Sequence, residues 1–171
     1  LGTVTFDMDS ALGEIAQMTG SVSLHLQQFV DLSGDVGVSR VGSELYVIAN
    51  HLSAVLAVGS ASINLANAAF GMKTDGTSLT FEASGADFSA VLAGLTAIRA
   101  ETVFVQYTNA LGGASAGETL TVGTFSYTFM QAILPNTVAF AVTGFSAQVL
   151  DFVSLEGDLA FSKTNDAILA V

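Results

Sequence analysis

The sequence predicts an all-β protein, an antiparallel, two-layered, sandwich-like array of hairpin units that extends in one direction. Three observations lead to this prediction. Apolar and polar residues alternate along most of the chain, short breaks rich in glycine separate the alternating runs, and parts of the sequence repeat. Alternation places successive side chains on opposite faces of a strand. Internal repetition is typical of arrays rather than of enzymes with a single site.

The alternating runs are the predicted strands, and they are rich in Val, Thr, Ile, Phe and Tyr, which suit a pleated surface. They cover residues 3–8, 21–26, 60–65, 77–81, 101–107, 118–125 and 137–142. The breaks between them read as hairpin turns, and they fall at 41–43, 75–77, 111–113, 135–136 and 165–166. The single proline, Pro135, lies in such a break, as expected for a residue that cannot donate to a strand ladder.

Three segments leave alternatives open. Residues 9–18 begin with a capping Asp or Ser and have apolar spacing close to a helical period, so one short helix near the N-terminus is an alternative there. Residues 51–58 and 88–95 are rich in Ala, Leu and Val, and each is either a helical turn or a strand. Residues 81–88 read as apolar or small on both faces, which is typical of a sheet covered on both sides. A β-solenoid is the alternative architecture.

Two repeats organise the chain. Residues 29–40 (FVDLSGDVGVSR) return 123 positions later as 152–163 (FVSLEGDLAFSK), with six of the twelve positions identical. A shorter repeat relates 53–59 to 89–94, 36 positions apart. We therefore divide the chain into residues 1–28, the N-terminal strands or the end of a preceding unit, then 29–148 and 149–171. The middle part is one module with two sub-units, 29–59 and 65–94, plus further strands, and the last part begins the next copy.

Composition limits the partners. Fifteen acidic residues against four basic ones give a net charge of −11, which repels the phosphates of nucleic acids. Hydrophobic residues make up 51% of the chain, but they occur in short alternating runs rather than in a stretch of about 20. We therefore expect no nucleic-acid partner and no membrane insertion. Cysteine is absent, so neither disulfides nor thiolate metal sites are available.

The sequence carries no catalytic motif, and we predict that the chain is not an enzyme. Neither a Gly-x-Ser-x-Gly nucleophile turn nor a histidine cluster with metal-ligand spacing occurs. We predict no cofactor, with calcium as the one alternative. Its candidate ligands are Asp7 and Asp9, on one pleat face about 7 Å apart, and Asp75 in a turn. The other reading of these acids is solvated turn residues, since the known calcium-loop signatures are absent.

The repeat also indicates residues for assembly. The C-terminal copy could take the place that the first copy fills internally, by strand addition to a neighbouring chain. The residues predicted to mediate this contact are Val149, Leu150, Phe152, Val153 and Leu155. Asp35 and Asp158, identical in the two copies, follow glycines, and we predict that they mark turn or bulge geometry.

The phrase Phe-Val-x-Leu-x-Gly-Asp, followed by Ser-Lys or Ser-Arg, a glycine turn and Leu-x-Val-x-Ala, resembles tandem β-rich modules of giant secreted bacterial surface proteins. Those adhesin-like proteins are of the repeats-in-toxin type. The resemblance covers residues 29–94 and 152–171 and implies an extracellular or cell-surface location. We expect a structural module of a bacterial fibre, sheath or adhesin whose partners are copies of itself. The alternative is a secreted module that binds carbohydrate or calcium.

Overall fold

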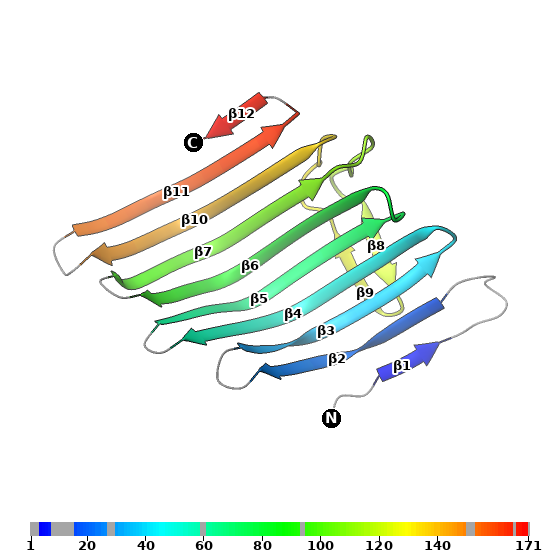
Figure 1. Ribbon diagram of the computed structural model, residues 1–171, viewed down its shortest axis with the longest axis horizontal. Coiled ribbons are helices and arrows are strands. Elements are labelled where there is room, and N and C mark those ends of the chain that lie inside the picture. Colours follow the sequence, from blue (N-terminus) through cyan, green and yellow to red (C-terminus); the bar gives the residue numbers. More distant parts are fainter. Residues whose placement is uncertain are drawn as a thin grey trace.

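The computed structural model is an all-β protein built around one long antiparallel sheet (Figure 1). The structure describes residues 4–7, 16–26, 30–58, 61–92, 95–149, 153–165 and 167–170. Ten strands form the sheet, and each pairs with its neighbours in sequence order, β8 and β9 excepted. The strands are β1 (Val4–Asp7), β2 (Ala16–Leu26), β3 (Val30–Val41), β4 (Glu44–Val58), β5 (Ala61–Thr74), β6 (Leu79–Leu92), β7 (Leu95–Thr108), β8 (Thr119–Val122), β9 (Phe125–Thr128), β10 (Thr137–Val149), β11 (Val153–Thr164) and β12 (Ala167–Ala170).

The predicted fold class is confirmed, and the alternatives are resolved where the structure describes them. Residues 51–58 lie in β4 and residues 88–92 in β6, so both ambiguous segments are strands. The end of the predicted helix, Ala16 to Met18, belongs to β2, and its earlier part lies outside the described residues. The solenoid alternative is wrong, because every described pair of neighbouring strands is antiparallel, as hairpin connections require.

The second layer is smaller than a sandwich predicts. It is the segment between β7 and β10, which we call the insertion, and it contains the β8–β9 hairpin and a bridge between Ala114 and Ile133. The insertion packs on one face of the sheet over β2 to β6. Its core contains these buried side chains: Ile48 of the sheet and Ala114, Leu120, Val122, Tyr127, Phe129 and Ile133 of the insertion.

A buried carboxylate fixes the insertion to the sheet. Glu82 of β6 has no exposed surface and accepts three hydrogen bonds. They come from Tyr127 Oη at 2.9 Å, the Met130 backbone N–H at 2.7 Å and Gln106 Nε2 at 2.7 Å. Burial, and then the charge of Glu82, raises the pKa of Tyr127. Three donors compensate the cost of removing the carboxylate from water, so Glu82 specifies where the insertion docks.

Side chains alternate between the two faces of the sheet, and this alternation changes phase in the middle of five central strands. In β4, β5, β6, β7 and β10, two consecutive residues face the insertion side, although strict alternation would turn one of them away. These pairs are Asn50–His51, Ala66–Asn67, Ala86–Asp87, Glu101–Thr102 and Thr143–Gly144, and we call them the bulge row. Four of the pairs contain a residue with φ between 52° and 59°, a conformation that Gly, Asn, Asp and His adopt most readily. The extra outward residue bends each strand away from that side.

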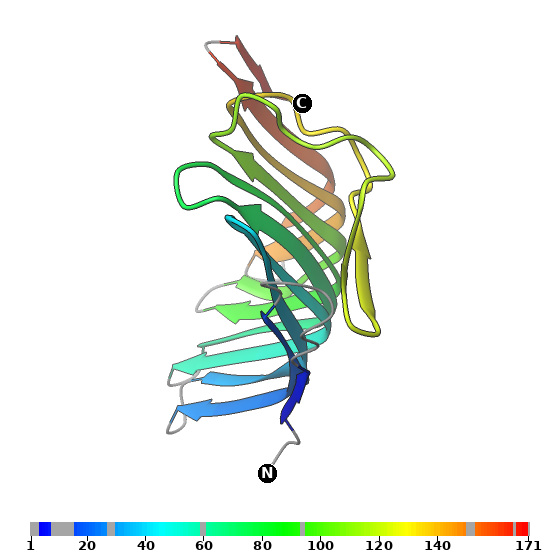
Figure 2. The same cartoon turned by 90° about the vertical axis from the view of Figure 1, so that its right-hand side faces the viewer.

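The sheet is therefore curved, with a convex face that carries the insertion and a concave face behind it (Figure 2). The exposed fractions of side chains on the two sides of the bulge row agree with this curvature. On the concave side of the bulge row, Ala49 is 0% and Ala100 4% exposed although the described residues place no second layer over them. On the convex side, the His51 side chain is 83% exposed. The phase change returns Phe88 to the face of Phe81, so the apolar side chains of residues 81–88 lie on the concave face, and the convex face carries small residues and two acids, Glu82 and Asp87.

The long repeat has the same strand bounds in both copies. β3 begins at Val30 and β11 at Val153, and both strands end eleven residues later. Asp35 and Asp158 lie where the pairing with β4 and β10 shifts register, which confirms the bulge prediction. The division into residues 1–28, 29–148 and 149–171 stays a prediction, because the pairing of β2 with β3 and of β10 with β11 is continuous across both boundaries.

Gly71 offers a test of the docking between the insertion and the sheet. A Cβ at Gly71 would lie 2.3 Å from Cδ1 of Tyr127, whereas a Cβ at Gly112 would meet nothing within 4 Å. We predict that Gly71→Ala lowers the free energy of unfolding by about 1–3 kcal/mol in urea titrations, because the Tyr127 ring has to shift. Gly112→Ala is the matched control and should change it by less than about 0.5 kcal/mol. Equal stability of the two variants would contradict this packing.

Candidate functional site

The most extensive candidate site is the concave face of the sheet. Its described side chains are apolar along each strand except near one edge. They include Val36 and Val38 of β3, Leu52 and Ala54 of β4, Phe70 and Met72 of β5, Phe81 and Phe88 of β6, Val103 and Val105 of β7, Phe140 and Phe145 of β10, and Leu155 and Leu159 of β11. The rings of Phe70 and Phe81 lie 5.7 Å apart, centroid to centroid. Antiparallel sheets commonly carry polar side chains on an open face, so an open face this apolar is unusual.

Most of the exposed large apolar side chains of the described residues lie on this face. Leu155 is 49%, Leu159 52% and Phe161 40% exposed. The full set on the concave face is Met18, Val22, Leu56, Ile63, Tyr107, Val138, Phe140, Val153, Leu155, Leu159, Phe161 and Ile168. At nine strand spacings of about 4.8 Å, the concave face runs for about 43 Å across the sheet.

Charge is segregated between the two faces. The register places the acidic residues of β3, β4, β6, β7 and β11 on the convex face: Asp31, Asp35, Glu44, Glu82, Asp87, Glu101, Glu156 and Asp158. It places no described acidic residue on the concave face. Arg40 and Lys163, in contrast, lie on the concave face, each one residue before its strand ends. They are equivalent positions of the long repeat, and both side chains are exposed.

Hydrogen bonds link polar side chains along the bulge row on the convex face. Asp35 accepts a bond from Ser21 Oγ at 2.7 Å and lies 3.2 Å from Nδ1 of His51. Further along the row, Asn67 donates to Asp87 at 3.0 Å, and the backbone N–H of Gly144 donates to Asp158 at 2.8 Å. These bonds join neighbouring strands where the bulges interrupt the ladder, so the row is structural.

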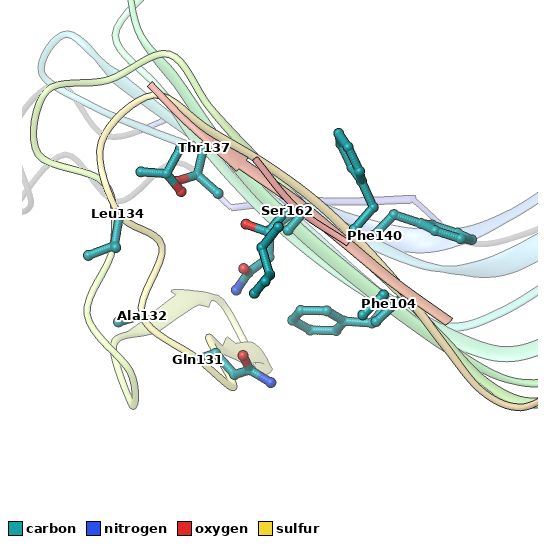
Figure 3. A pocket seen from close by; sticks show the side chains of 14 residues that line it. Phe104, Gln131, Ala132, Leu134, Thr137, Phe140 and Ser162 are labelled. Atoms are coloured by element: carbon teal, nitrogen blue, oxygen red, sulfur yellow. The ribbon is translucent and has the colours of Figure 1, made fainter. Parts of the chain in front are cut away.

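A smaller groove lies where the edge of the insertion overhangs β7, β10 and β11 (Figure 3). It has a volume of about 370 Å³. Phe104 points toward Gln131 of the insertion, whereas Phe140 points to the other side of the sheet (Figure 3). The groove is open and lined by small side chains such as Ala139 and Ala141, and it holds no charged group.

The structure does not bring the predicted calcium ligands together. The carboxylate of Asp75 accepts bonds from the backbone N–H groups of Thr77 and Ser78, at 2.9 and 2.7 Å, and thereby closes its own turn. These bonds hold the pKa of Asp75 well below its usual range. Asp7 is in β1, about 19 Å from β5 at the usual strand spacing, and Asp9 lies outside the described residues. Among the described residues, no group of three or more His, Asp or Glu is placed to hold a metal ion.

The predicted assembly residues lie at the junction of β10 and β11. Val149 ends β10 and pairs with Val153, which begins β11. Val153 and Leu155 are both 49% exposed and lie on the concave face. Leu150 and Phe152 lie outside the described residues. The concave face as a whole was missed by the sequence analysis, and the signal that reveals it is the change of phase in the alternation, for example at Val142-Thr-Gly-Phe145.

Comparisons with protein-family models, with curated proteins and with solved structures find no match to this chain. The resemblance to repeats-in-toxin modules therefore stays a prediction from sequence. The described residues also contain no helix that could cross a membrane.

The hydrogen bonds of Asp35 give a prediction on pH. The bond from Ser21, and then the bond from His51, hold the pKa of Asp35 below its usual 3.8. A carboxyl group with a lowered native pKa stabilises the fold above pH 3.8, and the contribution is lost as pH falls through the lowered pKa. We expect Ser21→Ala to raise the pKa of Asp35 toward 3.8, and His51→Ala to raise it less, in carboxyl-carbon NMR titrations.

Ser23→Ala is the matched control, because Ser23 lies two residues further along β2 and pairs with Ser33 rather than Asp35. It should leave the pKa of Asp35 unchanged. An Asp35 pKa that is the same in the parent chain and in Ser21→Ala would refute the hydrogen bond from Ser21 to Asp35 as the main cause of the lowered pKa.

Proposed function

We propose that the chain is a structural module of an extracellular bacterial fibre, sheath or adhesin, and that it associates with copies of itself through β-strand contacts. The strand order supports this. Each hairpin adds to the same sheet, so further units lengthen the sheet without changing its cross-section. The acidic, cysteine-free composition agrees with an extracellular location.

The correspondence of β11 and β12 with β3 and β4 carries the proposal. β12 pairs with Phe161–Thr164 of β11, and on that side the described residues supply no partner for Val153–Ala160. The equivalent strand β3 is paired along its length by the fifteen residues of β4. Moreover, β12 begins at Ala167, the position equivalent to Glu44 at the start of β4. β12 thus corresponds to the first part of β4, so β11 and β12 repeat the pairing of β3 with β4.

An unpaired strand edge is a template for strand addition, because its N–H and C=O groups are free to pair with a neighbouring chain. The stretch Val153–Ala160 contains Val153 and Leu155, two of the residues predicted for assembly. At the other end of the sheet, β1 pairs with residues 17–20 of β2, and the described residues supply no partner for residues 21–26 on that side. At each end of the sheet, therefore, part of one strand has no partner among the described residues. This arrangement favours head-to-tail growth.

The alternative function, a secreted module that binds carbohydrate or calcium, gains no support from the described residues. It remains a prediction of the sequence alone.

Two truncations test the proposal. We expect the chain that ends at Gln148 to remain folded but to form no filaments. It lacks β11, the strand whose edge the proposal assigns to assembly. The chain that ends at Asn165 loses β12 but keeps all of β11, and it should form filaments at least as readily as the parent. Circular dichroism checks folding, and light scattering with electron microscopy measures assembly.

Each truncation exposes a long strand, β10 in one case and β11 in the other. A general tendency of open edges to aggregate would therefore affect both chains. Filaments from the chain that ends at Gln148 would contradict the role of β11.

A further inference from the structure

We propose that the groove beside the insertion receives the β8–β9 hairpin of a second copy of this chain's repeat, so that one insertion follows another along the convex face. This inference rests on the proposed function in one respect, since further strands have to continue the sheet beyond β12. It starts from the long repeat, which gives every residue of β11 and β12 a counterpart 123 positions earlier, in β3 and β4.

In the first copy of the repeat, the β8–β9 hairpin covers the convex face of β2 to β4. Val122 and Phe125 lie over Gly37, where an added Cβ would be 3.0 and 3.3 Å from their side chains. The turn of the hairpin lies over β2, because a Cβ at Gly123 would be 2.6 Å from Nε2 of Gln17. The sheet residues under or beside the hairpin are Gln17 and Thr19 of β2, Gly37 and Ser39 of β3, and Tyr46 of β4.

The groove of Figure 3 is lined by the counterparts of these residues in the second copy. The pairing of β10 with β11 and of β11 with β12 places them as the pairing of β2 with β3 and of β3 with β4 places the first set. Gly37 and Ser39 are buried, whereas Ala160 is exposed and Leu169 is 64% exposed. In the part of the chain that the structure describes, the second copy thus presents this surface uncovered. In the same order, the counterparts are Ala139, Ala141, Ala160, Ser162 and Leu169.

The chemistry of the groove suits this hairpin. Alanines at 139 and 141 make the groove more apolar than the surface of β2, and Leu169 and Leu134 stand exposed at its two sides. The hairpin, residues 119–128, contains no charged side chain, and neither does the lining of the groove. Docking therefore removes apolar surface from water without burying a charge that lacks a partner.

One difference between the two copies decides how the hairpin fits. Ala160 carries the Cβ that Gly37 lacks, and a Cβ at that position would lie 3.0 Å from Cβ of Val122. On the adjacent strand, however, Ala139 replaces the longer Gln17, which lies against the turn of the hairpin in the first copy. A hairpin in the groove therefore sits slightly closer to β10, where the smaller side chain leaves it room.

The insertions of successive repeats also fit side by side. β3 and β11 are six strands apart, which corresponds to about 29 Å, whereas the insertion covers β2 to β6, which corresponds to about 19 Å. The insertion leaves the sheet between β7 and β10 and reaches back over the strands that precede it. In a second repeat, the same path leads over β10, β11 and β12, next to Gln131 and Ala132 at the edge of the first insertion.

The test uses two tandem chains of equal length. The first is the full chain followed directly by residues 49–171, a junction that keeps the phase of the 123-residue repeat. The second is residues 1–148 followed by residues 26–171. The two chains differ only where the first carries residues 149–171 and the second carries residues 26–48. The second chain is the matched control for folding, because its second insertion meets the surface that the hairpin covers in the parent.

The chain has no cysteine, so Ser162→Cys in the first unit gives a single thiol whose reaction with a water-soluble maleimide reports whether the groove is covered. We expect this thiol to react at least about ten-fold more slowly in the first tandem chain than in the parent chain, and as slowly as Ser39→Cys does. Lys163→Cys, next to it on the concave face, is the matched control and should react at the same rate in both chains. Val122→Asp in the second unit places a charge under its hairpin and should restore the fast reaction at Ser162→Cys.

Fast reaction of Ser162→Cys in a folded first tandem chain would overturn the proposal, and so would equal slowing at Ser162→Cys and Lys163→Cys. Circular dichroism checks folding. A first tandem chain that fails to fold while the second folds would also overturn it, because only residues 149–171 distinguish the two. If neither tandem chain folds, the sheet does not extend by repeats, and the proposed function fails together with this inference.

Discussion

The structure depends on one constraint, the change of phase that two consecutive outward residues impose on each central strand. Because the change occurs at the same level in β4, β5, β6, β7 and β10, the bends add up across the sheet instead of cancelling. One face becomes convex, polar and acidic, and the other becomes concave and apolar. The hydrogen bonds of Asp35, Asp87 and Asp158 hold the row where the bulges weaken the ladder.

The insertion packs on the face that the phase change makes convex. The insertion covers the convex face over β2 to β6, where Gly37 and Gly71 leave room for Val122, Phe125 and Tyr127, and where Glu82 of β6 supplies a buried acceptor. It leaves the concave face and the last strands open. The edge of β11 and the concave face are thus distinct surfaces, since the first offers backbone groups and the second offers apolar side chains.

Much of the fold could be predicted from the sequence because alternation and turn residues are local signals. The strands near Gly42, Asp75 and Asn165 end where turn chemistry requires. The bulge row was missed because each phase change occupies only two residues, and Gly85-Ala-Asp-Phe88 reads equally well as a strand that is apolar on both faces. The role of Glu82 was also beyond the sequence, since its donors lie 24 to 48 residues away. The predicted calcium ligands are all acidic, but they do not lie close together, because β2, β3 and β4 separate β1 from the turn at Asp75.

The phase change can be measured directly, because the chain has no cysteine and a single spin label can be placed at each position from Val138 to Ala147 of β10. Accessibility to a water-soluble paramagnetic reagent reports how exposed each label is. The account predicts low accessibility at Val142 and Ala147 and high accessibility at two consecutive positions between them, Thr143 and Gly144. Strict alternation through all ten positions would contradict it, and the concave face with it.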